Sequence, residues 1–171
     1  MQIGFYLNGL KNYLKGVELL MNLDFEKDDF RFNARVSAII YNKEKDKVLI
    51  FKMDGNDYYM LPGGRIEMFE DSLTAIKREI YEETGFKLDY ELSEIQENFV
   101  TKDNKKIMQY CFCYKATYND LIKDEFKCLD NDSQTFYWIN IRDIDNYNIV
   151  PKASYTLIKE NSNLKHIIER N

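Results

Sequence analysis

Near the start of the chain, apolar and polar residues alternate and predict a β-strand. In the segment FRFNARVSAIIY, every second residue from Phe32 to Ala38 is apolar, and the residues between them are polar. This two-residue period is typical of a strand with one apolar face. The polar run NKEKDK and the apolar run VLIFKM then predict a turn and a return strand.

Later segments predict further strands, and both ends of the chain predict helices. Between residues 7 and 22, apolar residues recur at helical spacing, which predicts an amphipathic helix. The tail, from Pro151 through KASYTLIKEN to LKHIIER, predicts one or two helices. The short segment YYMLPGG predicts a brief strand that proline and glycine end. The longer strand-like runs are LDYELSEIQENFVT, IMQYCFCYKATY and QTFYWINI.

A helix is predicted over residues 72–84, between two residues that suit its ends. Asp71 or Ser72 can cap its N-terminus, and Gly85 can adopt the left-handed conformation that ends a helix. At about 100° per residue, an apolar stripe runs from Leu73 to Thr84. An adjoining stripe carries the glutamates Glu79, Glu82 and Glu83.

The acidic stripe of this helix has two possible explanations. A solvated surface face is the common one. However, like charges four residues apart, such as Glu79 and Glu83, destabilise a helix, and acidic side chains in the last turn oppose the helix dipole. A divalent cation would resolve both conflicts, because Mg²⁺ prefers carboxylate oxygens and completes its shell with waters and substrate phosphates.

Length and element order favour a single domain of mixed class. A chain of 171 residues is long enough to bury one proper core. Strands, one helix, more strands and a terminal helix predict an α/β (α+β) fold with helices on the faces of a mixed sheet.

The spacing around the acidic helix resembles the signature of the Nudix hydrolase family. Five residues separate Gly64 from Glu70, and seven more lead to the pair Arg78-Glu79. Ile80, the pair Glu82-Glu83 and the pair Gly85-Phe86 complete the signature, which spans residues 64–86. At roughly 5% usage per residue type, seven fixed residues would match by chance on the order of once in 10⁹ windows. With LPGG before it and FYWINI and Pro151 after it, the resemblance covers about residues 32–158.

The resemblance implies a fold, a reaction and a set of residues. It implies a mixed sheet sandwiched between helices, to which we assign residues 31–171. It does not cover the N-terminal helix, so we assign residues 1–30 to a helical extension. The implied reaction is hydrolysis of a nucleoside diphosphate linked to another group, with Mg²⁺ or Mn²⁺ as cofactor. By similarity, the metal ligands and catalytic groups are Glu79, Glu82 and Glu83, with Gly63 lending its backbone carbonyl. The implied structural residues are Glu70 and Arg78 as a salt bridge, Gly64 and Gly85.

The general base and the substrate contacts are less defined. Glu79 is the favoured base, with Glu97 and Glu125 as candidates outside the signature. Arg35, Lys52 and Arg65 could bind phosphate oxygens, or each could be a solvated surface charge. Because marks of several known substrate classes are missing, we expect a nucleoside triphosphate or a small nucleoside diphosphate derivative.

The composition indicates which binding partners and which cellular compartment to expect. The formal net charge of -5 disfavours nucleic acid as a main partner, because surfaces that follow phosphates need a basic excess. No apolar run reaches membrane-spanning length, and the N-terminus does not resemble a secretion signal. Three cysteines and the single His166 favour reduced thiols in a cytoplasmic protein over a zinc site. The N-terminal apolar stripe could pack on the domain, cover the cleft or form a homodimer contact.

Two other functions compete with hydrolysis: a nucleotide sensor without turnover, and an isopentenyl diphosphate isomerase, which shares the fold. The intact set of glutamates argues against a sensor. An isomerase would need a cysteine at the site, and none lies near the signature. A nucleotide panel assayed with Mg²⁺ separates the first two. An enzyme turns over and loses that turnover in Glu82→Gln, whereas a sensor turns over in neither protein. Product analysis on isopentenyl diphosphate tests the third.

Overall fold

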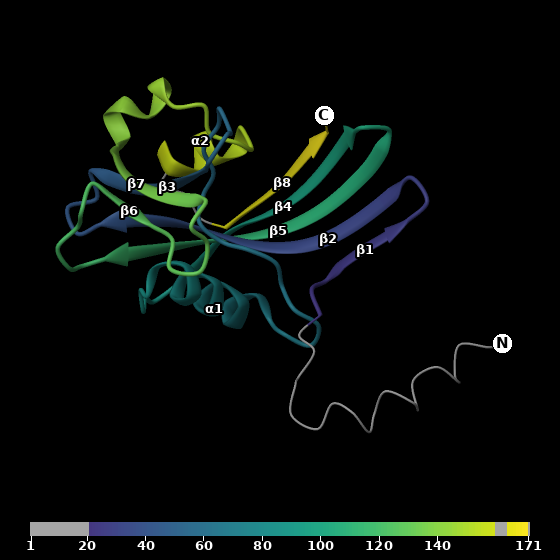
Figure 1. Ribbon diagram of the computed structural model, residues 1–171, viewed down its shortest axis with the longest axis horizontal. Coiled ribbons are helices and arrows are strands. Elements are labelled where there is room, and N and C mark those ends of the chain that lie inside the picture. The colour runs from purple at the N-terminus through teal and green to yellow at the C-terminus, as the bar shows by residue number, and fades with distance from the viewer. Residues whose placement is uncertain (1–20, 160–163, 171) are drawn as a thin grey trace.

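The computed structural model describes residues 21–159 and 164–170. Its core is one mixed sheet with a helix on each face (Figure 1). The elements, in chain order, are β1 (Asp24–Lys27), β2 (Phe30–Asn42), β3 (Lys47–Met53), α1 (Ser72–Thr84), β4 (Glu91–Lys102), β5 (Lys105–Tyr118), β6 (Glu125–Lys127), β7 (Gln134–Asn140), the 3₁₀ helix η1 (Ile141–Asn146), α2 (Ala153–Lys159) and β8 (Lys165–Arg170).

The strands follow the order β6-β7-β3-β2-β5-β4-β8, and β1 pairs with the first part of β2. The pairs β2–β5 and β4–β8 are parallel, whereas the other pairs are antiparallel. The 13-residue strand β2 is the spine of the sheet, because it pairs along its whole length with β5. The predicted α+β class with a mixed sheet between helices is confirmed.

The alternation of side chains along β2 creates two separate cores. On the face that α1 covers, here called the α1 face, Val36 and Ala38 pack in one cluster with Ile76 and Ile80 of the helix. On the opposite face, here called the α2 face, Ile39 packs with Leu157 of α2. The sheet therefore fixes the rotation of α1, because its apolar stripe has only one face on which to be buried.

One predicted element is wrong. The segment LKHIIER was expected to be helical, but residues 165–170 form β8, which pairs in parallel with β4. A run this short has no helical period to distinguish it from a strand. The edge of β4 supplies backbone hydrogen-bond partners, and a strand can use them whereas a helix cannot.

In the N-terminal region, the structure has a strand, β1, that was not predicted, because its residues DFEK are mostly polar. The helix predicted over residues 7–22 lies almost entirely outside the described residues, and of its last two positions Asn22 forms a bridge with Glu67. The division of the chain into a helical extension (residues 1–30) and a domain (residues 31–171) stays a prediction. None of the described helices is long and apolar enough to cross a membrane.

A pair of leucine truncations tests this packing. Leu49 in β3 is fully buried, whereas Leu121 is 98% exposed. Leu49→Ala is expected to lower the free energy of unfolding by about 2–5 kcal/mol, because it leaves a cavity in the core. Leu121→Ala should change it by less than about 0.5 kcal/mol. Urea unfolding of both variants measures the difference, and equal losses would contradict the described core.

Candidate functional site

The loop before α1 is attached to the edge of β2 by backbone hydrogen bonds. The N–H of Val36 donates to the carbonyl of Gly64 at 3.0 Å, and the N–H of Ala38 donates to the carbonyl of Pro62 at 2.9 Å. Gly63 lies between them with φ +136°, and a Cβ there would come within 2.3 Å of the Val36 carbonyl oxygen. Glycine is required at position 63 because the loop runs so close to the strand.

The two ends of α1 are capped as expected. The Asp71 carboxylate accepts hydrogen bonds from the N–H groups of Leu73 and Thr74, at 3.0 and 2.9 Å. Gly85, at φ +75°, ends the helix, and its N–H donates to the carbonyl of Tyr81. These caps and the buried apolar stripe direct Glu79 and Glu83 towards the glycine loop.

Glu79 lies against Gly64, a position where the backbone carries no side chain. A Cβ on Gly64 would lie 2.1 Å from Oε2 of Glu79, so any other residue would displace the carboxylate. Burial raises the pKa of Glu79, and the neighbouring Arg78 opposes that shift. Gly64 therefore provides the space in which this carboxylate lies.

Glu83 is a nearly buried carboxylate with one unsatisfied oxygen. Its residue is 8% exposed, and its Oε1 accepts a 2.9 Å hydrogen bond from Nε2 of Gln134 in β7. Its Oε2 is buried and has no hydrogen-bond partner among the described residues. Burial raises the pKa of Glu83 to about 7, the Gln134 hydrogen bond opposes that shift, and repulsion from Glu79 adds to it. A buried carboxylate with a free oxygen needs a positive partner.

Arg78 joins the helix to the loop. Its Nε and Nη2 donate to the two oxygens of Glu70, each at 2.9 Å, and Nη2 also donates to the Arg65 carbonyl at 3.0 Å. On the other side, Nη1 donates to Glu79 at 3.0 Å and to Glu82 at 3.2 Å. Hydrogen bonds from Arg78 lower the pKa of Glu70, as expected for a bidentate pair.

The predicted basic residues fall into two groups. Arg35 and Arg65 face each other across the bridge between β2 and the loop, and Arg35 acts electrostatically on Glu79. Nε of Arg65 lies 2.9 Å from Oδ2 of Asp24, a carboxylate whose pKa is lowered mainly by its hydrogen bonds with Arg31. Lys52 lies elsewhere on β3, with its ammonium 5.3 Å from the centre of the Tyr59 ring. The structure thus gathers Arg35 and Arg65 around the loop.

The two outside candidates for the general base belong to other elements. Glu97 lies on β4 and is 2.8 Å from Nε2 of His166 in β8. Glu125 is exposed on the short strand β6. Of the three candidates, Glu79 is the one that lies against the glycine loop.

The donor set is compatible with a hard divalent cation. Within residues 21–159 and 164–170, no three His, Cys, Asp or Glu side chains converge tightly enough to form a complete metal centre. Mg²⁺ does not require such a centre, because it is usually held by one or two carboxylates together with waters and substrate phosphates. Glu79 and the unpartnered oxygen of Glu83 fit that description.

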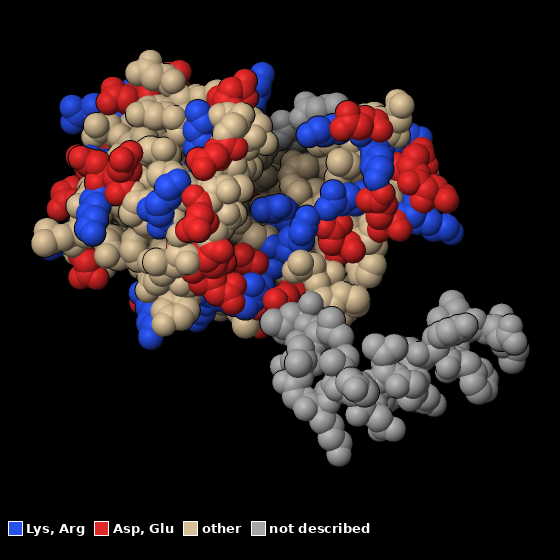
Figure 2. Space-filling model, in the orientation of Figure 1, with Lys and Arg blue, Asp and Glu red and all other residues tan. Residues whose placement is uncertain are grey.

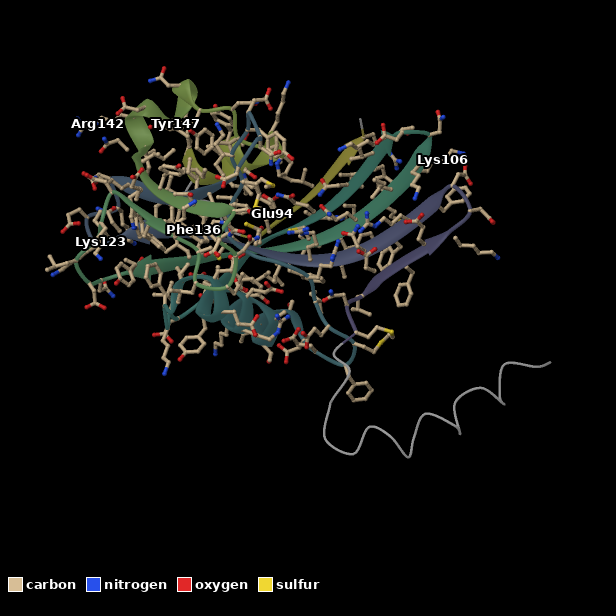
Figure 3. The ribbon with its side chains drawn as sticks, viewed as in Figure 1. Glu94, Lys106, Lys123, Phe136, Arg142 and Tyr147 are labelled. Carbon is tan, nitrogen blue, oxygen red and sulfur yellow. The ribbon has the colours of Figure 1, made fainter. Side chains whose placement is uncertain are left out.

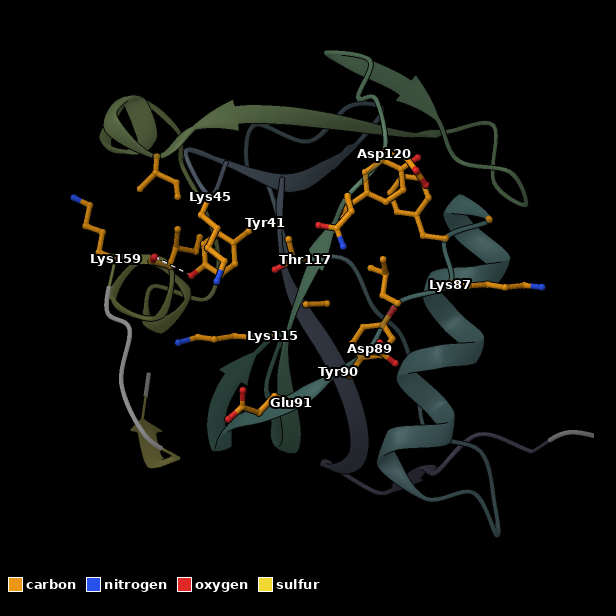
Figure 4. A pocket seen from close by; sticks show the side chains of 18 residues that line it. Tyr41, Lys45, Lys87, Asp89, Tyr90, Glu91, Lys115, Thr117, Asp120 and Lys159 are labelled. Atoms are coloured by element: carbon orange, nitrogen blue, oxygen red, sulfur yellow. Dashed lines mark hydrogen bonds between the residues drawn. The ribbon is translucent and has the colours of Figure 1, made fainter. Parts of the chain in front are cut away.

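A sizeable cavity lies away from these residues. It has a volume of about 1040 Å³ and opens between the C-terminal end of α1 and helix α2 (Figure 4). Among the described residues that line it are Tyr41, Gly85, Tyr118 and Lys159, and no signature glutamate is one of them. The charged chemistry of the site therefore lies outside this cavity.

Sequence reasoning missed two residues that contact the site. Gln134 holds Glu83, although 51 positions separate them, and Asp24 pairs with Arg65 from a strand that was not predicted. Neither residue belongs to a local motif. Gln134 is the polar first residue of the largely apolar strand β7, and this is the one signal that the sequence offers for it.

Comparisons with known proteins identify a family and a fold. The NUDIX domain model matches residues 31–159. A search of curated proteins finds no match. Similar solved structures include a MutT protein from Bacillus halodurans, with TM-score 0.63, 20% identity and coverage of 78% of this chain and 89% of that one.

Two further solved structures are similar at comparable coverage. The dihydroneopterin triphosphate pyrophosphohydrolase of E. coli has TM-score 0.57 and 13% identity, and the match covers 74% of this chain and 92% of that one. A hydrolase of the NUDIX family from Clostridium perfringens has TM-score 0.54 and 19% identity, with 74% and 95% coverage. At these identities the likeness establishes the fold.

The buried Glu83 predicts an unusual dependence of stability on pH. Because its pKa is raised from 4.5 to about 7, the folded protein holds a proton between these values that the unfolded chain releases. The free energy of unfolding should therefore fall as pH rises through this window. At pH 8 without divalent cations, Glu83→Gln should be more stable than the wild type by about 1–3 kcal/mol, and its pH dependence should be flatter.

Glu82→Gln is the matched control, because the Glu82 side chain is 48% exposed. Its stability should remain within about 0.5 kcal/mol of the wild type. Chemical unfolding at pH 5 and pH 8 in a chelator measures both variants. If Glu83→Gln were the less stable at pH 8, burial of the charge would not be the dominant effect.

Proposed function

The chain belongs to the NUDIX family, and from that premise we propose that it hydrolyses the pyrophosphate bond of a nucleoside diphosphate linked to another group, with Mg²⁺ or Mn²⁺ as cofactor. The substrate is a nucleoside triphosphate or a small nucleoside diphosphate derivative. One observation carries this proposal: the buried Glu83 has an unpartnered oxygen beside Glu79 and the glycine loop. A carboxylate in that position is costly to the fold unless a cation completes it.

The residues that would hold the cation come from α1 and the loop. They are Glu79, Glu82 and Glu83, with the backbone carbonyl of Gly63. When bound, such a cation would neutralise phosphate charge and make water more acidic. Gln134 occupies one oxygen of Glu83, which leaves Oε2 as the oxygen available for the cation.

Glu79 is the proposed general base. Burial raises its pKa, which makes its carboxylate a better proton acceptor. The hydrogen bond from Nη1 of Arg78 at 3.0 Å holds one oxygen of Glu79 and orients the other. Arg78 is in turn fixed by Glu70, so the base has a rigid support.

Arg35 and Arg65 are the proposed phosphate contacts. Both lie at the edge of β2 beside the loop, and the charge of Arg35 opposes the rise that burial causes in the pKa of Glu79. Guanidinium groups suit phosphate because they donate two parallel hydrogen bonds. A substrate phosphate would compete with Asp24 for Arg65.

Related structures support this class of substrate. Their names include a dihydroneopterin triphosphate pyrophosphohydrolase and an Ap4A hydrolase from C. elegans, the latter at TM-score 0.53. Both names refer to phosphate anhydrides. The three free, buried thiols support a reducing compartment such as the cytoplasm.

A nucleotide panel with Mg²⁺ tests the reaction. The wild type is expected to release products from at least one nucleoside triphosphate or diphosphate derivative, and ¹⁸O from labelled water identifies the phosphorus that is attacked. Glu79→Gln and Glu83→Gln should each lower kcat by about 10²–10⁴-fold, in the range that a general base contributes. Tight nucleotide binding without turnover by the wild type would instead indicate a sensor.

The glycine that accommodates Glu79 provides a second test. Gly64→Ala leaves all carboxylates intact but displaces Glu79, so kcat should fall by about 100-fold while the protein remains folded. Gly55→Ala is the matched control. Its φ of +84° makes alanine strained, yet no atom lies within 4 Å of the added Cβ. If both variants kept full activity, the position of Glu79 would not matter for the reaction.

A further inference from the structure

The strands β1, β2, β5, β4 and β8 project beyond helix α1 (Figure 1), and an apolar groove lies on their α1 face. The groove has a volume of about 620 Å³, and its lining includes Phe25, Phe30 and Met108. Phe25 is 48% exposed and Phe30 is 56% exposed. No helix among the described residues covers this part of the sheet. Exposed rings gathered in one place indicate a surface that another segment or molecule covers.

The strand register places five groove residues in one row, here called the strip. Phe32 of β2 pairs with Phe25 of β1 and with Met108 of β5. Met108 also pairs with Phe99 of β4, which pairs with Arg170 of β8. Phe32 packs against the core cluster beneath α1, so the strip belongs to the α1 face. It crosses five strands, and four strand spacings make it about 19 Å long.

Charged residues at the margin of the groove pair with one another. Figure 2 shows charged side chains of both signs over the projecting strands, and Figure 3 places Lys106 at their outer end. Nζ of Lys106 lies 3.7 Å from Oδ2 of Asp29 and 5.0 Å from the centre of the Phe30 ring. Lys105 pairs with Glu26. Because these cations have acidic partners, the margin favours an apolar occupant with little net charge over a polyanion.

The N-terminal segment of the chain has a sequence that suits this surface. Residues 1–20 lie outside the described residues, and their side chains carry two lysines and one glutamate, so their net charge is low. The sequence predicts an amphipathic helix whose apolar stripe is Leu7, Leu10, Leu14, Val17 and Met21. At 1.5 Å per residue, a helical stripe from Leu7 to Met21 is about 21 Å long, close to the length of the strip.

The predicted helix also needs a surface on which to pack. An isolated helix of about 15 residues is marginal in water. Gly9 and Gly16 weaken it further, because glycine loses more backbone freedom in a helix than other residues do. Burial of the apolar stripe would supply the stability that the sequence of the segment lacks.

The point at which the described chain begins places this segment beside the groove. The carbonyl of Met21 accepts a 2.7 Å hydrogen bond from the N–H of Met68, and the N–H of Leu23 donates to the carbonyl of Ile66 at 2.8 Å. These bonds attach the start of the described chain to the loop before α1. Phe25 of the strip follows Met21 by four residues, and Met21 itself is 53% exposed. A segment that ends at Met21 therefore starts at the β1 end of the strip.

We propose that the groove is the docking site of the chain's own N-terminal segment, with the apolar stripe of residues 7–21 packed on the strip. A helix that ends at Met21 is long enough to cover the strip from β1 to β8. The segment is favoured over a second copy of the chain, because its attachment at Met21 holds it at a high effective concentration beside the groove. The docked segment would continue the helix layer on the α1 face beyond α1.

Two double variants of the full chain, matched in charge, test the role of the stripe. Leu10→Asp with Leu14→Asp places two carboxylates on the stripe. Asn8→Asp with Asn12→Asp adds the same charge on the opposite side of the predicted helix, so it is the control. Docking should be lost in the first double variant and retained in the second, because a charged side chain is costly to bury on an apolar surface.

Hydroxyl-radical footprinting with mass spectrometry measures the exposure of the groove rings. Oxidation of Phe25 and Phe30 should be about 3–5-fold faster in the stripe variant than in the wild type, because the leucines that cover them are lost. The control variant should keep the wild-type rate. Tyr81, which lies on α1 and is 51% exposed, is the internal reference and should react equally in all three proteins.

A change on the groove side provides the reciprocal test. Phe30→Asp alters an exposed ring of the groove, and Leu121→Asp makes a similar change at a position that is 98% exposed and outside the groove. Hydrogen exchange of the amides of residues 7–20, followed by mass spectrometry, reports docking of the segment. Exchange should be about 10-fold faster in Phe30→Asp than in the wild type, and unchanged in Leu121→Asp.

Other occupants of the groove would give different results. If Phe25 and Phe30 of the wild type were oxidised as readily as Tyr81, the groove would be open and the proposal would be overturned. Protection that survives in the stripe variant would also overturn it. Sedimentation over a range of concentrations would then show whether the protection follows a dimer, which would assign the groove to a second copy. Neither measurement uses a substrate, so the result does not depend on the proposed reaction.

Discussion

The attachment of helix α1 to the glycine loop through Arg78 is the interaction on which the rest of the site depends. Its guanidinium group donates hydrogen bonds to Glu70 and the Arg65 carbonyl in the loop, and to Glu79 and Glu82 in the helix. Arg78 therefore holds the loop and the helix together. It also balances the charge of a helix that carries three glutamates near its C-terminal end. Without it, like charges and the helix dipole would both oppose the last turns of α1.

The same arrangement shows a conflict between stability and function. Glu83 is buried with one oxygen unpartnered, and Glu94 is buried with two, so the fold retains groups that an unconstrained core would replace by apolar ones. Buried groups of this kind are often retained at functional sites, where a ligand satisfies them.

Much of the fold could be predicted from the sequence. The alternating pattern of β2, the caps at Asp71 and Gly85 and the apolar stripe of α1 are local signals, and the structure has each of them. The helix expected at LKHIIER is wrong because seven residues with two isoleucines suit either element, and only the edge of β4 decides between them. The strand β1 was not expected, because a polar edge strand has no hydrophobic period.

By itself, the sequence determined which residues of the signature lie on one side of a capped helix, because helix geometry converts spacing into direction. Through the family resemblance, it also gave Gly63 and Gly64 as residues of the site. Only the tertiary structure decided that Gln134 holds Glu83, that Asp24 competes for Arg65 and that Asn33, Gln109 and Asn98 form one chain of hydrogen bonds. These contacts join residues from 11 to 76 positions apart, and strand order and register, which no local pattern encodes, bring them together.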